Sequence, residues 1–117
     1  MTVGEDDVFY DDLMIELFVS EISENVMQEY LSKLFPGQNL EKMNTWMQLI
    51  DSYFTHEGSI NAMAESLFMH KNTLQYKLKK MAEMTGKDIR LPSNSAVFYM
   101  ATEFYHRLSE NDENGNR

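Results

Sequence analysis

Residues 58–90 read GSINAMAESLFMHKNTLQYKLKKMAEMTGKDIR and contain two apolar patterns of helical period that follow each other closely. The first pattern predicts a short helix over residues 60–67, and the second predicts a longer helix over 71–84 that ends at Gly86. Only residues 68–70 connect the two helices, which is too few for an antiparallel hairpin of long helices. A connection of this length is typical of the crossed pair in a helix-turn-helix.

The side chains of these two helices support this interpretation. Ala64 is small at the place where two helix axes must cross. The apolar positions that such a unit buries are also present, at Met63, Leu67, Met69 and Leu74. Phe68 is the discordant residue, because many units of this kind have glycine at this turn, where the backbone conformation favours it.

The rest of the chain also has a helical pattern and lacks the clean alternation of a strand. Apolar residues repeat at spacings of three and four over residues 10–18, 26–35, 43–54 and 97–108. We therefore predict an all-α fold, a single bundle of about six helices. Its predicted buried side chains include Trp46, Ile50, Leu67, Leu74, Leu78, Val97 and Phe104.

Residues with capping chemistry mark the ends of these helices. Ser23 and Ser59 are candidate N-caps, because a serine hydroxyl accepts a hydrogen bond from the open N–H groups of the first helical turn. Pro36-Gly37 is a candidate helix end. Ser93 or Asn94 is the candidate N-cap of the last helix.

Composition limits the class of protein. A chain of 117 residues with 43% hydrophobic residues is the size of one folded domain, and the absence of cysteine excludes disulfides and thiolate sites. No apolar run is long enough for a membrane span, and the first residues lack the basic start of a signal peptide, so we expect a cytoplasmic protein. The ten methionines fit a helical core or, alternatively, a groove for a partner.

Charge is distributed unevenly along the chain, whose formal net charge is −9. Residues 1–58 hold twelve acidic and two basic residues, a net charge of −10. Residues 69–90 hold six basic and two acidic residues, a net charge of +4. This basic segment is either an ordinary solvated surface or a nucleic-acid contact.

The second helix of the pair favours the nucleic-acid contact. At 100° per residue, its apolar side chains share one face, and Asn72, Tyr76 and Lys79 lie on the opposite face. Amides near a helix start can read adenine, whereas lysines and a tyrosine hydroxyl can bind phosphates. The predicted DNA-binding residues are His70, Lys71, Asn72, Thr73, Gln75, Tyr76, Lys79 and Lys80. For Asn72-Thr73 the alternative is local capping, and for Tyr76 it is simple surface coverage.

No pattern of residues indicates catalysis. His56-Glu57 begins like a zinc-protease motif, but Ile60 stands where the second histidine would be. The acidic pairs Asp6-Asp7 and Asp11-Asp12 fit solvated helix starts better than a catalytic pair. We therefore expect no enzyme activity, no metal site and no cofactor.

The same segment closely resembles the C-terminal helix-turn-helix of the PucR/CdaR group of bacterial regulators. The motif of that group is L-F/H-x-H-R/K-N-T-L-x-Y-R/K-L followed by T-G-x-D-x-R. The matching residues are Leu67, Phe68, His70, Lys71, Asn72, Thr73, Leu74, Tyr76, Lys77 and Leu78, then Thr85, Gly86, Asp88 and Arg90. Phe68 fits the turn of this group. Lysine replaces the commoner arginine at Lys71 and Lys77, which loses bidentate reading of guanine, and Gln75 stands where arginine is often found.

The resemblance covers roughly residues 8–108 and implies a Fis-like helix-turn-helix within the bundle. It implies one domain over 8–108, in which residues 1–58 supply N-terminal helices that pack on a helix-turn-helix and closing helix at 59–108. Residues 109–117 are predicted to form a disordered tail.

The function that the resemblance implies is sequence-specific binding of double-stranded DNA, as the C-terminal part of a longer effector-sensing regulator. Because one short recognition helix reads only a few base pairs, we also predict that the full regulator acts as a homodimer. We expect no small-molecule ligand and no membrane association for this part. The alternative is an acidic helical protein-interaction module that does not bind DNA.

Overall fold

The structure is a computed structural model that describes residues 14–115. Residues 14–19 are helical, and five further helices follow: α2 (Glu24–Leu34), α3 (Leu40–Thr55), α4 (Ile60–Ser66), α5 (Lys71–Thr85) and α6 (Pro92–Gly115). Residues 14–115 contain no strand, so the predicted all-α fold is confirmed. The start of the first predicted helix, including Tyr10 and the pairs Asp6-Asp7 and Asp11-Asp12, lies outside the described residues.

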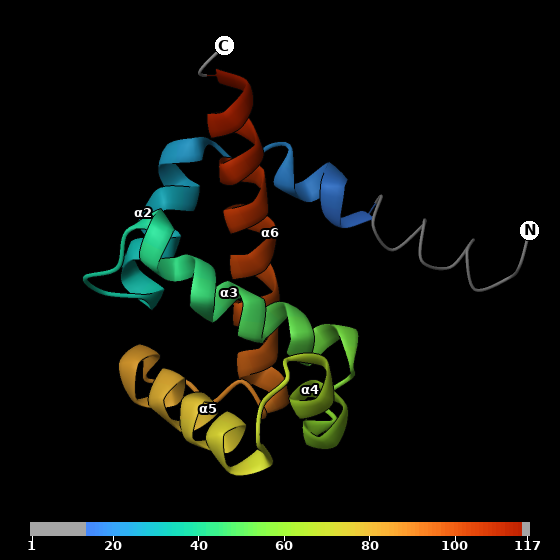
Figure 1. Ribbon diagram of the computed structural model, residues 1–117. Coiled ribbons are helices and arrows are strands. Elements are labelled where there is room, and N and C mark those ends of the chain that lie inside the picture. Colours follow the sequence, from blue (N-terminus) through green and yellow to red (C-terminus); the bar gives the residue numbers. More distant parts are fainter. Residues whose placement is uncertain (1–13, 116–117) are drawn as a thin grey trace, which may run out of the picture.

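The long helix α6 is the scaffold of the molecule (Figure 1). Helices α2 and α3 pack directly against it, whereas α4 packs on α5 and also touches α3. Aromatic side chains join α6 to α2: the rings of Tyr30 and Phe104 meet edge to face at 5.0 Å, and Phe98 is fully buried. The helix-turn-helix pair α4–α5 thus lies at one end of a bundle held together by α6 (Figure 1).

The predicted local signals at three helix ends are confirmed. The Ser23 hydroxyl accepts from the N–H of Val26, and the Ser59 hydroxyl accepts from the N–H of Ala62, each at 3.2 Å. Gly86 ends α5 with a φ of 75°, the left-handed conformation that glycine adopts without strain.

The start of α6 differs from the prediction. The helix begins at Pro92, whose fixed φ suits the first helical position, and not after a cap at Ser93 or Asn94. The Asn94 side chain instead donates to the backbone carbonyl of Asp88 at 3.1 Å. It therefore ties α6 to the turn that follows α5.

That turn is held by a local ion pair. Arg90 donates from Nη2 and Nε to the two carboxylate oxygens of Asp88, at 2.9 and 3.0 Å, and its backbone N–H adds a third hydrogen bond. These hydrogen bonds, first from the side chain and then from the backbone, lower the pKa of Asp88 below its usual value. Between the two residues, Ile89 is buried and anchors the turn in the core.

Burial agrees with the prediction at four of the seven positions. Ile50, Leu74, Leu78 and Phe104 are at most 2% exposed. The prediction of full burial is wrong for Trp46, Leu67 and Val97, which are only half-buried. Trp46 and Leu67 line an open cavity between α3 and α5, and Val97 lines a shallow groove beside α2, so one side of each remains accessible.

Helix α6 continues past Leu108 to Gly115, over residues that the sequence pattern assigned to a disordered tail at 109–117. The reason is contact with the N-terminal helices. The Asn111 amide donates to Glu24 at 2.8 Å, and the Arg107 guanidinium forms an ion pair with Glu16. These are pairings between distant parts of the chain, which a local pattern does not reveal.

Leu78→Ala should lower the free energy of unfolding by about 2–5 kcal/mol, the usual range for emptying a buried leucine site. Leu78 is 2% exposed in the face of α5 that packs on the core. Urea denaturation followed by circular dichroism measures the change. Glu83→Ala, at an exposed position of the same helix, is the control and should change stability by no more than a few tenths of a kcal/mol. Equal effects of the two substitutions would contradict this orientation of α5.

Candidate nucleic-acid interface

Helices α4 and α5 form the predicted helix-turn-helix. Met63 and Ala64 of α4 are buried where the two helices meet, at 0% and 8% exposure. The chain leaves α4 through hydrogen bonds from the N–H of Phe68 to Glu65 O (3.2 Å) and from the N–H of Met69 to Ala64 O (2.9 Å). The short connection then directs the chain into α5 at a crossed angle (Figure 1).

Phe68 has an unfavourable backbone conformation in this turn. Its φ is 55°, and its side chain is 97% exposed. A left-handed conformation costs a non-glycine residue roughly 1–2 kcal/mol, and the exposed ring recovers none of this by packing within the described residues. The turn therefore has the geometry for which many helix-turn-helix units use glycine, although this chain has phenylalanine.

Helix α5 has one buried and one exposed face. Leu74, Leu78 and Met81 are at most 2% exposed. All eight predicted DNA-binding residues are exposed on the rest of the helix or at its start: His70, Lys71, Asn72, Thr73, Gln75, Tyr76, Lys79 and Lys80. The structure thus brings them onto one continuous surface along one helix.

The N-terminus of α5 is open, unlike those of the three preceding helices. Ser23, Asn39 and Ser59 each cap their helix with a side-chain hydrogen bond. His70 is the N-cap of α5 and makes no such bond. The first N–H groups of α5 are therefore available to an external acceptor, and the positive end of the helix dipole favours an anion there.

The charges on α5 also favour binding of an anion. Lys71 is the first residue of the helix, where the dipole disfavours a cation. Among residues 14–111, none of the four lysines of α5 forms an ion pair, whereas Lys33, Arg90 and Arg107 elsewhere do. Unpaired lysines beside an open helix N-terminus form a surface suited to phosphates.

Sequence reasoning missed this open N-terminus. Whether a cap forms depends on the rotamer of one side chain, which a residue pattern does not show. The available signal was the residue type, since histidine is not among the preferred N-caps.

Comparison with known proteins identifies relatives of this chain. The sequence model of the PucR C-terminal helix-turn-helix domain matches residues 46–104, which run from the middle of α3 into α6. The uncharacterized protein YsfB of Bacillus subtilis is 30% identical over 97 residues, which cover 83% of this chain and 26% of that protein. The carbohydrate diacid regulator of Escherichia coli is 25% identical over 96 residues, 81% of this chain and 25% of that protein.

A third relative is the proline-responsive transcriptional activator PutR of Bacillus subtilis, 30% identical over 84 residues, which cover 68% of this chain and 20% of that protein. No solved structure gives a significant match. The chain therefore spans about a quarter or less of the length of these relatives.

His70→Asp and His70→Asn should each raise the free energy of unfolding by about 0.5–2 kcal/mol, because both supply the missing N-cap. They should differ in binding to duplex DNA. The carboxylate introduced by His70→Asp would place a negative charge where a phosphate is expected, so this variant should bind DNA more weakly than His70→Asn. Urea denaturation and fluorescence anisotropy measure the two effects. If neither substitution raised the stability, the first N–H groups of α5 would already have hydrogen-bond partners.

Proposed function

We propose that this chain, which belongs to the family of PucR C-terminal helix-turn-helix domains, is the sequence-specific DNA-binding domain of a longer bacterial transcriptional regulator. The observation that carries the proposal is the exposed face of α5, with its open N-terminus and unpaired lysines. The family is a class of transcription-regulator domain and not a class of enzyme. No helix in the described part of the chain could cross a bilayer, and we propose that the regulator acts in the bacterial cytoplasm, where its DNA lies.

In the proposed complex, the N-terminal half of α5 enters the major groove, as the recognition helix of a helix-turn-helix does. Asn72 and Gln75 contact base edges, because an amide matches the acceptor and donor of adenine. Lys71 and the open N–H groups bind a phosphate at the edge of the groove. Tyr76, Lys79 and Lys80 lie further along, where a straight helix leaves the groove floor and meets the backbone.

His70 and Thr73 complete the proposed contact surface. Both lie at the start of α5 and both are exposed. The His70 ring and the Thr73 hydroxyl can donate hydrogen bonds to phosphate oxygens on either side of the open N-terminus. These contacts position the helix without reading sequence.

The acidic first half of the chain contributes to orientation. Residues 1–58 carry a net charge of −10, whereas the surface of α5 is positive. Repulsion between the acidic part and DNA favours approach by the α5 face, and it keeps non-specific affinity low.

Asn72→Ala and Lys79→Ala should separate reading of sequence from contact with the backbone. Asn72→Ala should cost about 1–3 kcal/mol of binding free energy on the preferred duplex and little on random DNA. Lys79→Ala should weaken binding to both duplexes about equally and lower the salt slope by about one unit. The preferred duplex is obtained by selection from random DNA, and both variants are titrated at two salt concentrations.

The opposite assignment, with Asn72→Ala lowering both affinities alike and Lys79→Ala changing sequence preference, would contradict the proposed placement of α5. Binding of DNA that does not weaken with rising salt, or no binding at all, would favour the alternative of an acidic protein-interaction module.

We further propose that the full regulator acts as a homodimer, because one recognition helix reads only a few base pairs. The binding site should then contain two half-sites about 10 base pairs apart, or a multiple of that distance. Footprinting of the full regulator on selected DNA measures this spacing. One short uninterrupted site protected by a monomer would contradict the dimer.

A further inference from the structure

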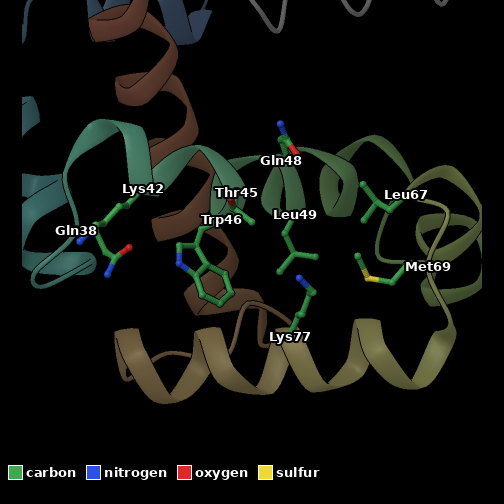
Figure 2. A pocket seen from close by; sticks show the side chains of 9 residues that line it. All are labelled: Gln38, Lys42, Thr45, Trp46, Gln48, Leu49, Leu67, Met69 and Lys77. Atoms are coloured by element: carbon green, nitrogen blue, oxygen red, sulfur yellow. The ribbon is translucent and has the colours of Figure 1, made fainter.

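Phe68, in the turn between α4 and α5, is the most exposed large apolar side chain in the described part of the chain. It is 97% exposed, and the next, Met14, is 67% exposed. Its two neighbours in the turn point inward: Leu67 and Met69 pack against the core and line the open cavity beside α3. Figure 2 shows the Met69 side chain extending from the turn toward Leu49 of α3. Phe68 is therefore the one apolar residue of this turn that is left in solvent.

The backbone of the turn holds Phe68 in this exposed position. Its N–H donates to the carbonyl of Glu65, and the N–H of Met69 donates to the carbonyl of Ala64. The φ of 55° is unfavourable for phenylalanine, whereas glycine adopts it without strain. Stability alone thus favours glycine here, and strain of this kind is typical of binding sites.

The surroundings of the ring indicate what it binds. Phe68 and His70, the uncapped first residue before α5, line the same shallow hollow of about 320 Å³. No acidic residue occurs between Phe68 and Lys80, a stretch that holds four lysines. Because interfaces between proteins are depleted in lysine, an exposed ring beside lysines and open N–H groups suits DNA better than a protein partner.

Glu65 is the one acidic side chain among the residues that line this hollow. It is exposed on α4 and repels phosphates on that side of the ring. On the other side, Lys71 and the open N-terminus of α5 attract them. A duplex would therefore meet the Phe68 ring from the α5 side.

We propose that Phe68 is a further DNA-contact residue, whose ring packs on apolar carbon atoms of the duplex beside the bases that α5 reads. This inference rests on the proposed function of α5. Two groups of DNA have the required chemistry, the C5-methyl group of thymine in the major groove and the carbons of deoxyribose. A ring held on a fixed turn has only two side-chain torsions to order, so the contact costs little conformational entropy.

Phe68→Gly separates this role from a structural one, because its two expected effects have opposite signs. Glycine relieves the left-handed strain, so the urea midpoint of unfolding should rise. The affinity for the preferred duplex, obtained by selection from random DNA, should fall about ten-fold. Phe68→Leu keeps an apolar side chain and should retain most of the affinity. Circular dichroism in urea and fluorescence anisotropy measure the two effects on the 117-residue chain.

Glu57→Gly is the matched control. Glu57 also has a positive φ, of 51°, in the turn between α3 and α4, and it does not line the hollow beside Phe68. Glycine at this position should raise the urea midpoint as well. The affinity for DNA should not fall, since the substitution removes only strain and a negative charge.

Replacement of thymine by uracil distinguishes the two sources of apolar carbon, because deoxyuridine lacks only the methyl group of thymidine. Each thymine of the preferred duplex is replaced in turn. A loss of affinity at one thymine that Phe68→Gly does not share identifies the methyl group. No loss at any thymine, with the lower affinity of Phe68→Gly unchanged, identifies deoxyribose.

Three results would overturn the proposal while the unchanged chain still binds DNA. The first is a stabilised Phe68→Gly that keeps its full affinity, which would leave the ring for a protein partner. The second is a Phe68→Gly that loses both stability and affinity, because the side chain would then be structural. The third is a Phe68→Leu that binds as weakly as Phe68→Gly. Absence of salt-dependent DNA binding by the unchanged chain would instead refute the proposed function of α5, and this contact with it.

Discussion

The burial of Leu74, Leu78 and Met81 fixes the rotation of α5 about its own axis, and the properties of the site depend on that rotation. These side chains are at most 2% exposed. With a helix period of 3.6 residues, their burial leaves Asn72, Gln75 and Lys79 in solvent. The apolar core therefore determines which polar side chains can meet a ligand.

Several local features near α5 are unfavourable for stability. Phe68 adopts a left-handed conformation, His70 leaves the helix without a side-chain cap, and Lys71 places a cation at the positive end of the helix. Away from α5, Glu57 also has a positive φ, of 51°, whereas Ser23 and Ser59 cap their helices. Because departures from local preference concentrate where a protein binds its ligand, this clustering supports the proposed role of the α5 surface.

The packing of α6 and of the turn before it stabilises the domain despite these unfavourable features near α5. Helix α6 packs against α2 and α3, and its buried aromatic side chains join distant parts of the chain. The Asp88–Arg90 pair and the buried Ile89 hold the turn that connects α5 to α6.

The sequence by itself determined the features that depend on neighbouring residues. The helices, the caps at Ser23 and Ser59 and the left-handed end at Gly86 could all be predicted, because each rests on hydrogen bonds within a few residues or on apolar periodicity. The helix-turn-helix could also be predicted, since a short connection between two amphipathic helices leaves few arrangements.

Only the tertiary structure decided how closely the helices approach one another. Periodicity shows which face of a helix is apolar but not whether a neighbour covers it fully, so Trp46, Leu67 and Val97 remain half-buried beside a cavity and a groove. The extent of α6 depends on Asn111 and Arg107, whose partners lie in the N-terminal helices. These pairings join residues far apart in the chain, and packing in three dimensions alone brings them together.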